Sequence, residues 1–252
     1  MTPSTPGRDT LRGGPDHQTA SDSRTVAAKR GVDRATVGWL VLAIAGLGGF
    51  AAITVLLLNR WVPGFDQPLL DGAKQWQSLA LLWRIISESA NIPLIVIGVG
   101  MVLVLFFTKH RREAVLVAVI LIAITAGSEA VKQLVHRDRP SGTDPNIPGV
   151  VYSFPSGHVL EALSIFGILA IRAFRSHLAT IVRVLIVIAV LVDADLVGIA
   201  RVALAAHWPS DVIASYIGAL GVLGVYGLLT HRAGSDDARP ADGPPADARG
   251  TP

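Results

Sequence analysis

Residues 151–171 read VYSFPSGHVLEALSIFGILAI, a polar turn that runs directly into a long apolar segment. With its continuation to residue 174, the apolar part approaches the ~20 residues that a helix needs to cross a bilayer. A hydrophobic helix usually starts with a simple cap, but this one starts with Pro155, two small residues and a histidine. The stretch therefore predicts a membrane helix whose first turn does more than end a loop.

The composition of the chain is typical of a polytopic membrane protein. Of the 252 residues, 51% are hydrophobic and only 16% are charged, which does not suit a soluble domain of this length. The net charge is only +3 and basic residues cluster near the ends of apolar segments, so a nucleic-acid-binding face is not indicated. The sequence contains no cysteine, which excludes disulfides and thiolate metal sites.

The chain divides into two polar tails and one apolar domain. Residues 1–34 are polar without a hydrophobic period, and residues 232–252 are rich in Ala, Asp, Pro and Gly. We predict that both are disordered cytoplasmic tails and that the first apolar segment is a retained anchor rather than a cleaved signal peptide. Residues 35–231 are predicted to form one all-α domain, a polytopic membrane bundle with six transmembrane helices.

Six apolar segments, each near ~20 residues, are the predicted spans. They are residues 36–58, 91–108, 114–135, 156–174, 180–201 and 209–230. The fifth differs from the others because it carries two acidic residues, Asp193 and Asp195. Residues 61–90 mix Trp and Ala at helical spacing with Lys, Gln and Arg. This pattern indicates an extracytoplasmic helical segment, which either lies in the membrane interface or packs as an ordinary loop helix.

The positions of Lys and Arg predict the orientation of these spans, because cytoplasmic loops carry an excess of both. The more basic side carries Arg24, Lys29, Arg30, Arg34, Lys109, Arg111, Arg112, Arg172, Arg175, Arg183 and Arg232. We therefore predict that both tails are cytoplasmic and that positions 145 and 205 are extracytoplasmic. The extracytoplasmic side carries Arg60, Lys74, Arg84, Lys132, Arg137, Arg139 and Arg201. The last four of these need another explanation.

Three short motifs fall at helix ends on the extracytoplasmic side: KQLVHRDRP (132–140), PSGH (155–158) and ARVALAAHWPSD (200–211). Together they bring cations, two histidines, one carboxylate and a Ser-Gly turn to one membrane face. A phosphoryl group in transfer spreads negative charge over three oxygens, so these residue types suit phosphoryl transfer. Taken singly, the motifs could be snorkelling anchors, a helix cap and an interface residue. Their coincidence favours a site.

Cations and backbone amides would bind the phosphate oxygens. Lys132, Arg139 and Arg201 would supply positive charge, the two arginines as bidentate forks. Lys132 and Arg139 are about two helical turns apart and share a face if the helix persists to the following proline. The small residues Ser156 and Gly157 would let a phosphate approach the unpaired amides of a helix N-terminus.

The two histidines suit two roles in one reaction, nucleophilic attack on phosphorus and protonation of the departing alkoxide. His207 is followed one helical turn later by Asp211. A carboxylate that holds one ring nitrogen fixes the tautomer and leaves the other nitrogen as the nucleophile. His158 has no such neighbour in the sequence and is predicted to be the acid.

The ordered patterns Lys-x6-Arg-Pro, Pro-Ser-Gly-His and Arg-x5-His-x3-Asp resemble those of the type 2 phosphatidic acid phosphatase superfamily, which includes lipid phosphate phosphatases and vanadium-dependent haloperoxidases. The resemblance covers roughly residues 91–230. It implies a helical bundle, a phosphohistidine intermediate and, in the phosphatases, no metal or other cofactor. By position it implies phosphate contacts from Lys132, Arg139, Ser156, Gly157 and Arg201, with His207 as nucleophile, His158 as general acid and Asp211 as the partner of His207.

One position departs from the family pattern. The third motif usually opens with Ser-Arg, and here it opens with Ala200-Arg201. A Ser hydroxyl could donate one hydrogen bond, whose loss should cost about 1 kcal/mol and weaken activity rather than abolish it.

The leading hypothesis from the sequence is an integral-membrane phosphatase that acts on a lipid phosphate or diphosphate at the outer leaflet. The candidate substrates are polyprenyl diphosphates, phosphatidate and phosphatidylglycerol phosphate. A bacterial polyprenyl diphosphatase is slightly favoured because an extracytoplasmic site suits carrier recycling. The alternatives are a phosphotransferase that uses the same phosphohistidine and a non-enzymatic lipid-phosphate transporter or binding protein. Four acidic residues near or within the spans are functional suspects with open roles, namely Glu129, Glu161, Asp193 and Asp195.

Overall fold

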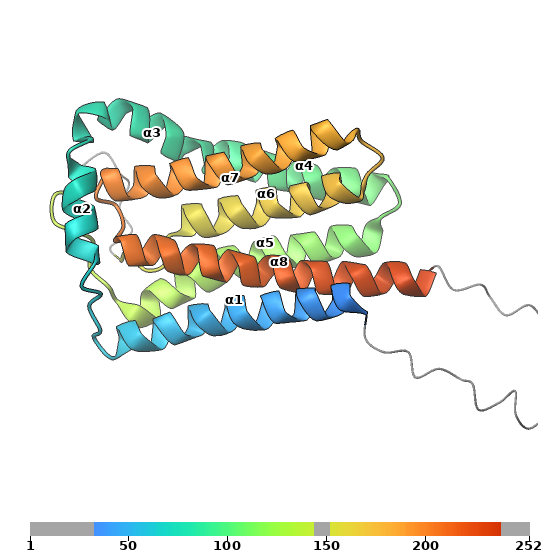
Figure 1. Ribbon diagram of the computed structural model, residues 1–252, viewed down its shortest axis with the longest axis horizontal. Helices are drawn as coiled ribbons and strands as arrows, with labels where there is room; N and C mark the ends of the chain where they lie inside the picture. The colour runs from blue at the N-terminus through green and yellow to red at the C-terminus, as the bar shows by residue number, and fades with distance from the viewer. Residues whose placement is uncertain (1–32, 144–151, 238–252) are drawn as a thin grey trace, which may run out of the picture. The chain divides into compact units, whose positions relative to one another are not determined.

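The computed structural model describes residues 33–143 and 152–237 (Figure 1). Within these residues the regular elements are helices, apart from one isolated bridge between Asp138 and Tyr152. In chain order they are α1 (Arg34–Leu58), α2 (Asp66–Lys74), η2 (Gln77–Leu79), α3 (Ala80–Ser89), α4 (Ile92–Phe107), α5 (Arg111–Val135), α6 (Gly157–Arg175), α7 (Thr180–Ala203) and α8 (Pro209–Asp237). The predicted all-α helical bundle is confirmed.

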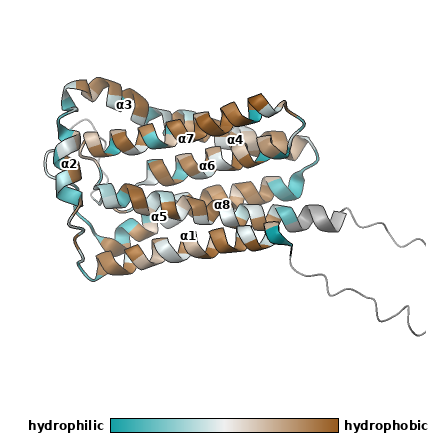
Figure 2. Ribbon diagram, viewed as in Figure 1, coloured by the Kyte–Doolittle hydropathy of each residue, from teal (hydrophilic) through white to brown (hydrophobic). Residues whose placement is uncertain are grey.

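Five segments in the described part of the chain are long and apolar enough to cross a membrane. They are Arg34–Leu58, Gln77–Phe107, Arg111–Val135, Gly157–Arg175 and Pro209–His231. These helices are mostly apolar along their length, and polar residues concentrate toward their ends (Figure 2). The predicted count of six is therefore not reached by length and composition. The predicted span that does not meet these criteria is α7. It has 24 residues, but four charged residues interrupt its apolar sequence, namely Arg183, Asp193, Asp195 and Arg201.

Reversal of the chain at each connection brings alternate helix ends together. α6 packs against both α7 and α8, α1 packs along α8, and α4 packs along α5. The C-terminal ends of α5 and α7 lie at the same end of the bundle as the N-terminal ends of α6 and α8 (Figure 1). We call this the site end. Each of the three sequence motifs lies at one of these helix ends, so the fold gathers them in one region.

The contact between α1 and α8 depends on glycine. A Cβ added at Gly46 would lie 2.2 Å from the backbone nitrogen of Gly221, and a Cβ added at Gly221 would lie 2.5 Å from the backbone nitrogen of Leu47. Side chains at either position would push the two backbones apart, as expected for membrane helices that pack through small residues. This close contact holds α8, whose N-terminal turn belongs to the site end.

α5 ends at Val135, which is also the end of the predicted span 114–135. His136, directly after the helix, has a left-handed conformation with φ of 51°. The chain then runs in an extended form in which Asp138 bridges to Tyr152. The helix does not persist to Pro140, so the condition under which Lys132 and Arg139 would share a helical face is not met. The turn at His136, not the later proline, ends the helix.

The segment predicted at residues 61–90 contains α2 and α3, joined through η2. α2 packs against α7 and α8, and α3 packs along α7. Both helices therefore belong to the packed bundle, and their position relative to the membrane stays a prediction. α8 continues to Asp237, into the stretch predicted as the C-terminal tail. The rest of both predicted tails lies outside the described residues.

Candidate active site

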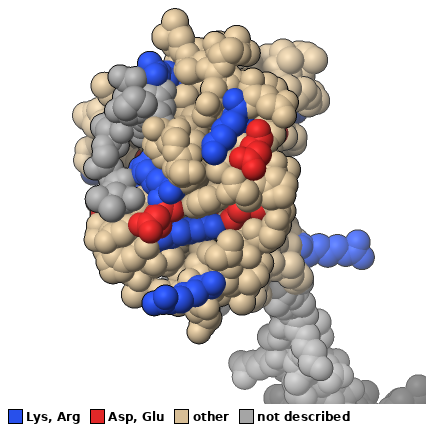
Figure 3. All heavy atoms as spheres, turned by 90° about the vertical axis from the view of Figure 1, so that its left-hand side faces the viewer, with Lys and Arg blue, Asp and Glu red and all other residues tan. Residues whose placement is uncertain are grey.

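Charged side chains gather at the site end of the bundle, where basic and acidic groups lie among uncharged residues (Figure 3). Several polar residues there are buried. Ser156, Arg201, His207 and Asp211 are each at most 4% exposed. Burying polar and charged groups is costly unless they are paired, and such groups in membrane proteins commonly serve a function. The cluster is therefore a candidate site.

His207 lies in the short turn between α7 and α8. Its Nδ1–H donates a hydrogen bond to the carbonyl oxygen of Ser153. Because a carbonyl oxygen only accepts, Nδ1 carries the proton and Nε2 of the neutral ring keeps its lone pair. Burial, followed by the positive charges of Arg201 and Arg139, lowers the pKa of His207 well below its usual value. The ring is therefore neutral near pH 7, the form that a nucleophile needs.

Asp211 lies close to His207 but does not form the hydrogen bond expected from their spacing. Its Oδ2 is 3.7 Å from Nδ1 of His207 and accepts the backbone N–H of Trp208 at 2.9 Å. Its Oδ1 accepts a hydrogen bond from Nη1 of Arg137. The contact that sets the tautomer of His207 is therefore made by Ser153, while Asp211 places a negative charge beside the ring.

Arg201 and Ser156 each present a buried polar atom to the site end. Nη1 of Arg201 donates to Oγ of Ser87 on α3 at 2.9 Å, but its Nε has no hydrogen-bond partner among the described residues. In that same part of the chain, Oγ of Ser156 also lacks a partner, and its backbone N–H donates to Oγ of Ser215 at 2.9 Å. Buried polar atoms are rarely left unsatisfied. An anion with several acceptor oxygens could satisfy both.

Lys132 meets the N-terminus of α6. A Cβ added at Gly157 would lie 3.8 Å from Nζ of Lys132, so the ammonium group lies beside the first turn of the helix. The N–H groups of that turn have no acceptor within the helix, which makes the turn suitable for an anion. His158 is the next residue and interacts electrostatically with Arg201 and His207. The positive charges of Lys132, Arg139 and Arg201 therefore act on both histidines.

Arg139 reaches the site from the extended segment after α5, and its Nη1 donates to the carbonyl oxygen of Ala206 at 3.1 Å, next to His207. The structure thus brings all the predicted site residues to one end of the bundle; they are Lys132, Arg139, Ser156, Gly157, His158, Arg201, His207 and Asp211. Within residues 33–143 and 152–237, no group of three or more His, Cys, Asp or Glu side chains is arranged to hold a metal ion.

Sequence reasoning missed the residues that support this site. Arg137 was noticeable only as a basic residue on the less basic side, without a role. The others carried no signal because their partners are distant in the chain, 54 residues for Ser153 and His207 and 144 for Asp66 and Ser210. The supporting residues are Asp66, Ser87, Arg137, Ser153, Ser210 and Ser215.

Two of the acidic residues with open roles line an apolar cavity of about 470 Å³ between α4, α5 and α6. Glu129 also pairs with Lys132, with 3.4 Å between Oε2 and Nζ. Glu161 accepts a hydrogen bond from Oγ1 of Thr125 at 3.0 Å. One lining residue of the cavity, Glu129, therefore pairs with Lys132, which we expect to bind phosphate.

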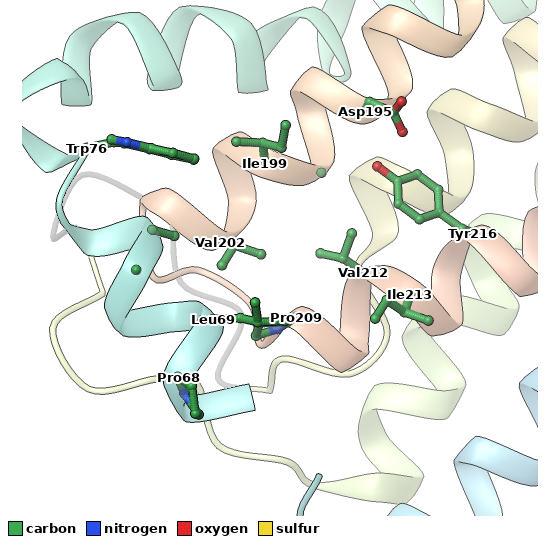
Figure 4. A pocket seen from close by; sticks show the side chains of 13 residues that line it. Pro68, Leu69, Trp76, Asp195, Ile199, Val202, Pro209, Val212, Ile213 and Tyr216 are labelled. Carbon is green, nitrogen blue, oxygen red and sulfur yellow. The ribbon is translucent and has the colours of Figure 1, made fainter. Parts of the chain in front are cut away.

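A second apolar cavity, of about 600 Å³, lies between α2, α7 and α8 (Figure 4). Asp195 and Tyr216 face each other in its lining. Asp193 instead accepts a hydrogen bond from Ser89 at 3.3 Å. Among the described residues, neither aspartate forms an ion pair with Arg201.

The fold and this cluster define a class of protein, a multi-pass membrane bundle with a cationic, two-histidine centre at one end. The sequence profile of the PAP2 superfamily matches residues 113–233, a range that contains all three motifs. Over this range the chain is similar to the PAP2 superfamily.

Two comparisons with known proteins agree with this placement. Phosphatidylglycerophosphatase B of Bacillus subtilis (strain 168) is 31% identical over 140 residues. That match covers 54% of this chain and 65% of the relative, so the chain aligns with somewhat less than two thirds of it. The fold resembles the crystal structure of a transmembrane PAP2-type phosphatidylglycerolphosphate phosphatase from Bacillus subtilis, with a TM-score of 0.56 and 19% identity. That similarity covers 79% of this chain and 99% of the other.

Proposed function

We propose that the chain is an integral-membrane phosphatase that hydrolyses a lipid phosphate or diphosphate through a phosphohistidine intermediate. The observation that carries this proposal is the state of His207. It is a neutral imidazole whose Nδ1 donates to Ser153, and burial, followed by the charges of two arginines, lowers its pKa. A neutral nucleophile among cations suits attack on an anionic phosphate, because the cations stabilise the charge that spreads over the oxygens in the transition state.

The first half of the reaction would form the phosphoenzyme. Nε2 of His207 attacks phosphorus, and the bond between phosphorus and the lipid oxygen breaks. His158, protonated in the substrate complex, donates its proton to the departing oxygen. In the second half, neutral His158 accepts a proton from water as the water attacks phosphorus, the P–N bond breaks, and inorganic phosphate leaves.

The phosphate oxygens would lie among the groups identified above. Nε of Arg201 is a buried donor without a partner among the described residues, and Ser87 holds the other side of its guanidinium group. Lys132 and the first turn of α6 would contact the remaining oxygens. The apolar cavity lined by Glu129, which pairs with Lys132, offers a place for the hydrocarbon tail of the lipid.

The test of this function is phosphate release by the purified protein in detergent. Phosphatidylglycerol phosphate leads the substrate panel because the Bacillus subtilis relative is named for it, followed by a polyprenyl diphosphate and phosphatidate. We expect release from at least one of these lipids, equal with and without EDTA. No release from any of them, or release only after addition of Mg²⁺, would count against the proposed mechanism.

We also propose that α7 crosses the membrane, which gives six spans. α6 leaves the site end and α8 starts again at the site end (Figure 1). The chain between them must therefore return across the bilayer, and α7 is the helix that does so. With six spans both tails lie on the more basic side, which places them in the cytoplasm and the site outside it.

Cysteine labelling should test this orientation, since the natural chain contains no cysteine. Position 145 lies outside the described residues, so the exposed residue Ser141 is the better choice. We expect Ser141→Cys to react with a membrane-impermeant maleimide in intact cells. His110→Cys, exposed at the opposite end of α5, should react only after the cells are opened. Labelling of both from the same side would contradict the six-span topology.

A further inference from the structure

A buried carboxylate on α2 reaches the candidate active site. Asp66, the first residue of α2, is 1% exposed. Its Oδ1 accepts the backbone N–H of Ser210 at 2.8 Å, and its Oδ2 accepts Oγ–H of Ser210 at 2.7 Å. Oδ2 also accepts Nη2–H of Arg137 at 2.6 Å. These contacts tie α2 to the N-terminal turn of α8 and to the segment that follows α5.

Arg137 connects Asp66 to Asp211. Its Nη2 is held by Asp66, while its Nη1 donates to Asp211 and, at 2.7 Å, to Oγ of Ser210. The guanidinium group is planar and rigid, so fixing one nitrogen also fixes the direction of the other. Asp66 therefore fixes how Arg137 meets Asp211, although among the described residues no hydrogen bond or ion pair joins Asp66 to Asp211 directly.

The charges of this cluster favour the reaction at His207. The carboxylates of Asp66 and Asp211 share the single guanidinium group of Arg137, so the three side chains together carry a net negative charge. The nearest atom of this cluster to His207 is Oδ2 of Asp211, 3.7 Å from Nδ1 of the ring. The ring becomes positively charged as Nε2 bonds to phosphorus, in surroundings that already hold Lys132, Arg139 and Arg201. A nearby negative charge stabilises that positive charge in a low-dielectric site.

We infer that Asp66 is a positioning residue for phosphoryl transfer, which acts on Asp211 and His207 through Arg137. The inference rests on the proposed function. Asp66 lies outside residues 113–233, the range that the PAP2 profile matches. α2 would thus contribute a positioning residue to the site, in addition to connecting α1 with the helices that follow.

Asp66→Asn tests the inference because it preserves the size of the side chain and removes its charge. The matched control is Asp71→Asn on the same helix, where the carboxylate is 57% exposed and pairs with Lys74. For Asp66→Asn we expect kcat to fall roughly 10- to 100-fold, as is typical when a group that orients a reacting side chain is lost. KM should stay near the wild-type value, and Asp71→Asn should match the wild type throughout. A kcat within twofold of the wild type would overturn the inference and leave the phosphatase proposal intact.

A double-mutant cycle tests whether Asp66 acts through Arg137. In an Arg137→Gln background, Asp66→Asn should lower kcat little further, because the connection is already broken. Independent, multiplying losses would overturn the inference. If Asp66→Asn fails to fold, Asp66→Glu replaces it. Its carboxylate is displaced by one methylene, so kcat should fall at unchanged KM, and an unchanged kcat would overturn the inference.

Orthovanadate binding separates failure of this inference from failure of the proposed function. Vanadate imitates the transition state of phosphoryl transfer, and calorimetry measures its affinity without turnover. Weaker binding to Asp66→Asn than to wild type and Asp71→Asn would support the inference even if every lipid in the panel proved inert. Equal affinity for all three proteins would overturn it. A wild-type protein that neither binds vanadate nor releases phosphate would overturn both proposals.

Discussion

His207→Ala should reduce the turnover of every phosphate substrate by roughly 10⁴-fold or more, because it removes the proposed nucleophile and with it the covalent step. The structure supplies the reason for choosing this histidine. Its Nδ1 donates to Ser153, its pKa is lowered by burial and by neighbouring arginines, and its Nε2 is therefore an available lone pair. Among the predicted site residues in the described part of the chain, only His207 combines a ring nitrogen fixed by a backbone carbonyl oxygen with a second ring nitrogen left as a lone pair.

Trapping the phosphoenzyme is the decisive measurement. Wild-type protein quenched during turnover with a labelled substrate should carry phosphate in an acid-labile, base-stable linkage, and His207→Ala should carry none. His110→Ala is the control, since His110 is exposed at the opposite end of α5 and should retain full activity. A phosphoenzyme that persists in His207→Ala would exclude His207 as the nucleophile.

His158→Ala should slow hydrolysis of a lipid phosphate by about 10²- to 10⁴-fold, the usual contribution of a general acid. His158 lies in the first turn of α6, in the same electrostatic environment as His207. An alkoxide is a poor leaving group and needs a proton as it departs. An aryl phosphate needs much less help, because its leaving group is more stable as an anion.

Comparison of the two substrates therefore identifies the acid. His158→Ala should regain much of its activity on an aryl phosphate such as p-nitrophenyl phosphate, and His207→Ala should regain none. The quantity to compare is the ratio of kcat values for each variant and the wild type, measured for both substrates. An equal loss on the two substrates would assign His158 to phosphate binding instead of proton transfer.

The sequence alone was sufficient to predict the main helices and the end of the bundle at which the candidate site lies. The predicted span 156–174 corresponds to α6 (Gly157–Arg175), and 180–201 corresponds to α7 (Thr180–Ala203). Such segments are readable because a membrane helix must satisfy its backbone hydrogen bonds internally and be apolar over a set length, and both requirements are local. Because consecutive long helices run in opposite directions, the three motifs at their ends lie at the same end of the bundle.

Only the tertiary structure decided which groups touch each other within the site. The four-residue spacing of His207 and Asp211 suggested a hydrogen bond, but the partner of Nδ1 is Ser153, 54 residues away. Asp211 contacts Arg137, which in turn contacts Asp66 on α2, a residue that the sequence did not mark as part of the site. A hydrogen bond depends on differences of a few tenths of an ångström and on direction. Those depend on the path of the chain after α5 and on how α2 packs on α8, and no local pattern of residues specifies either.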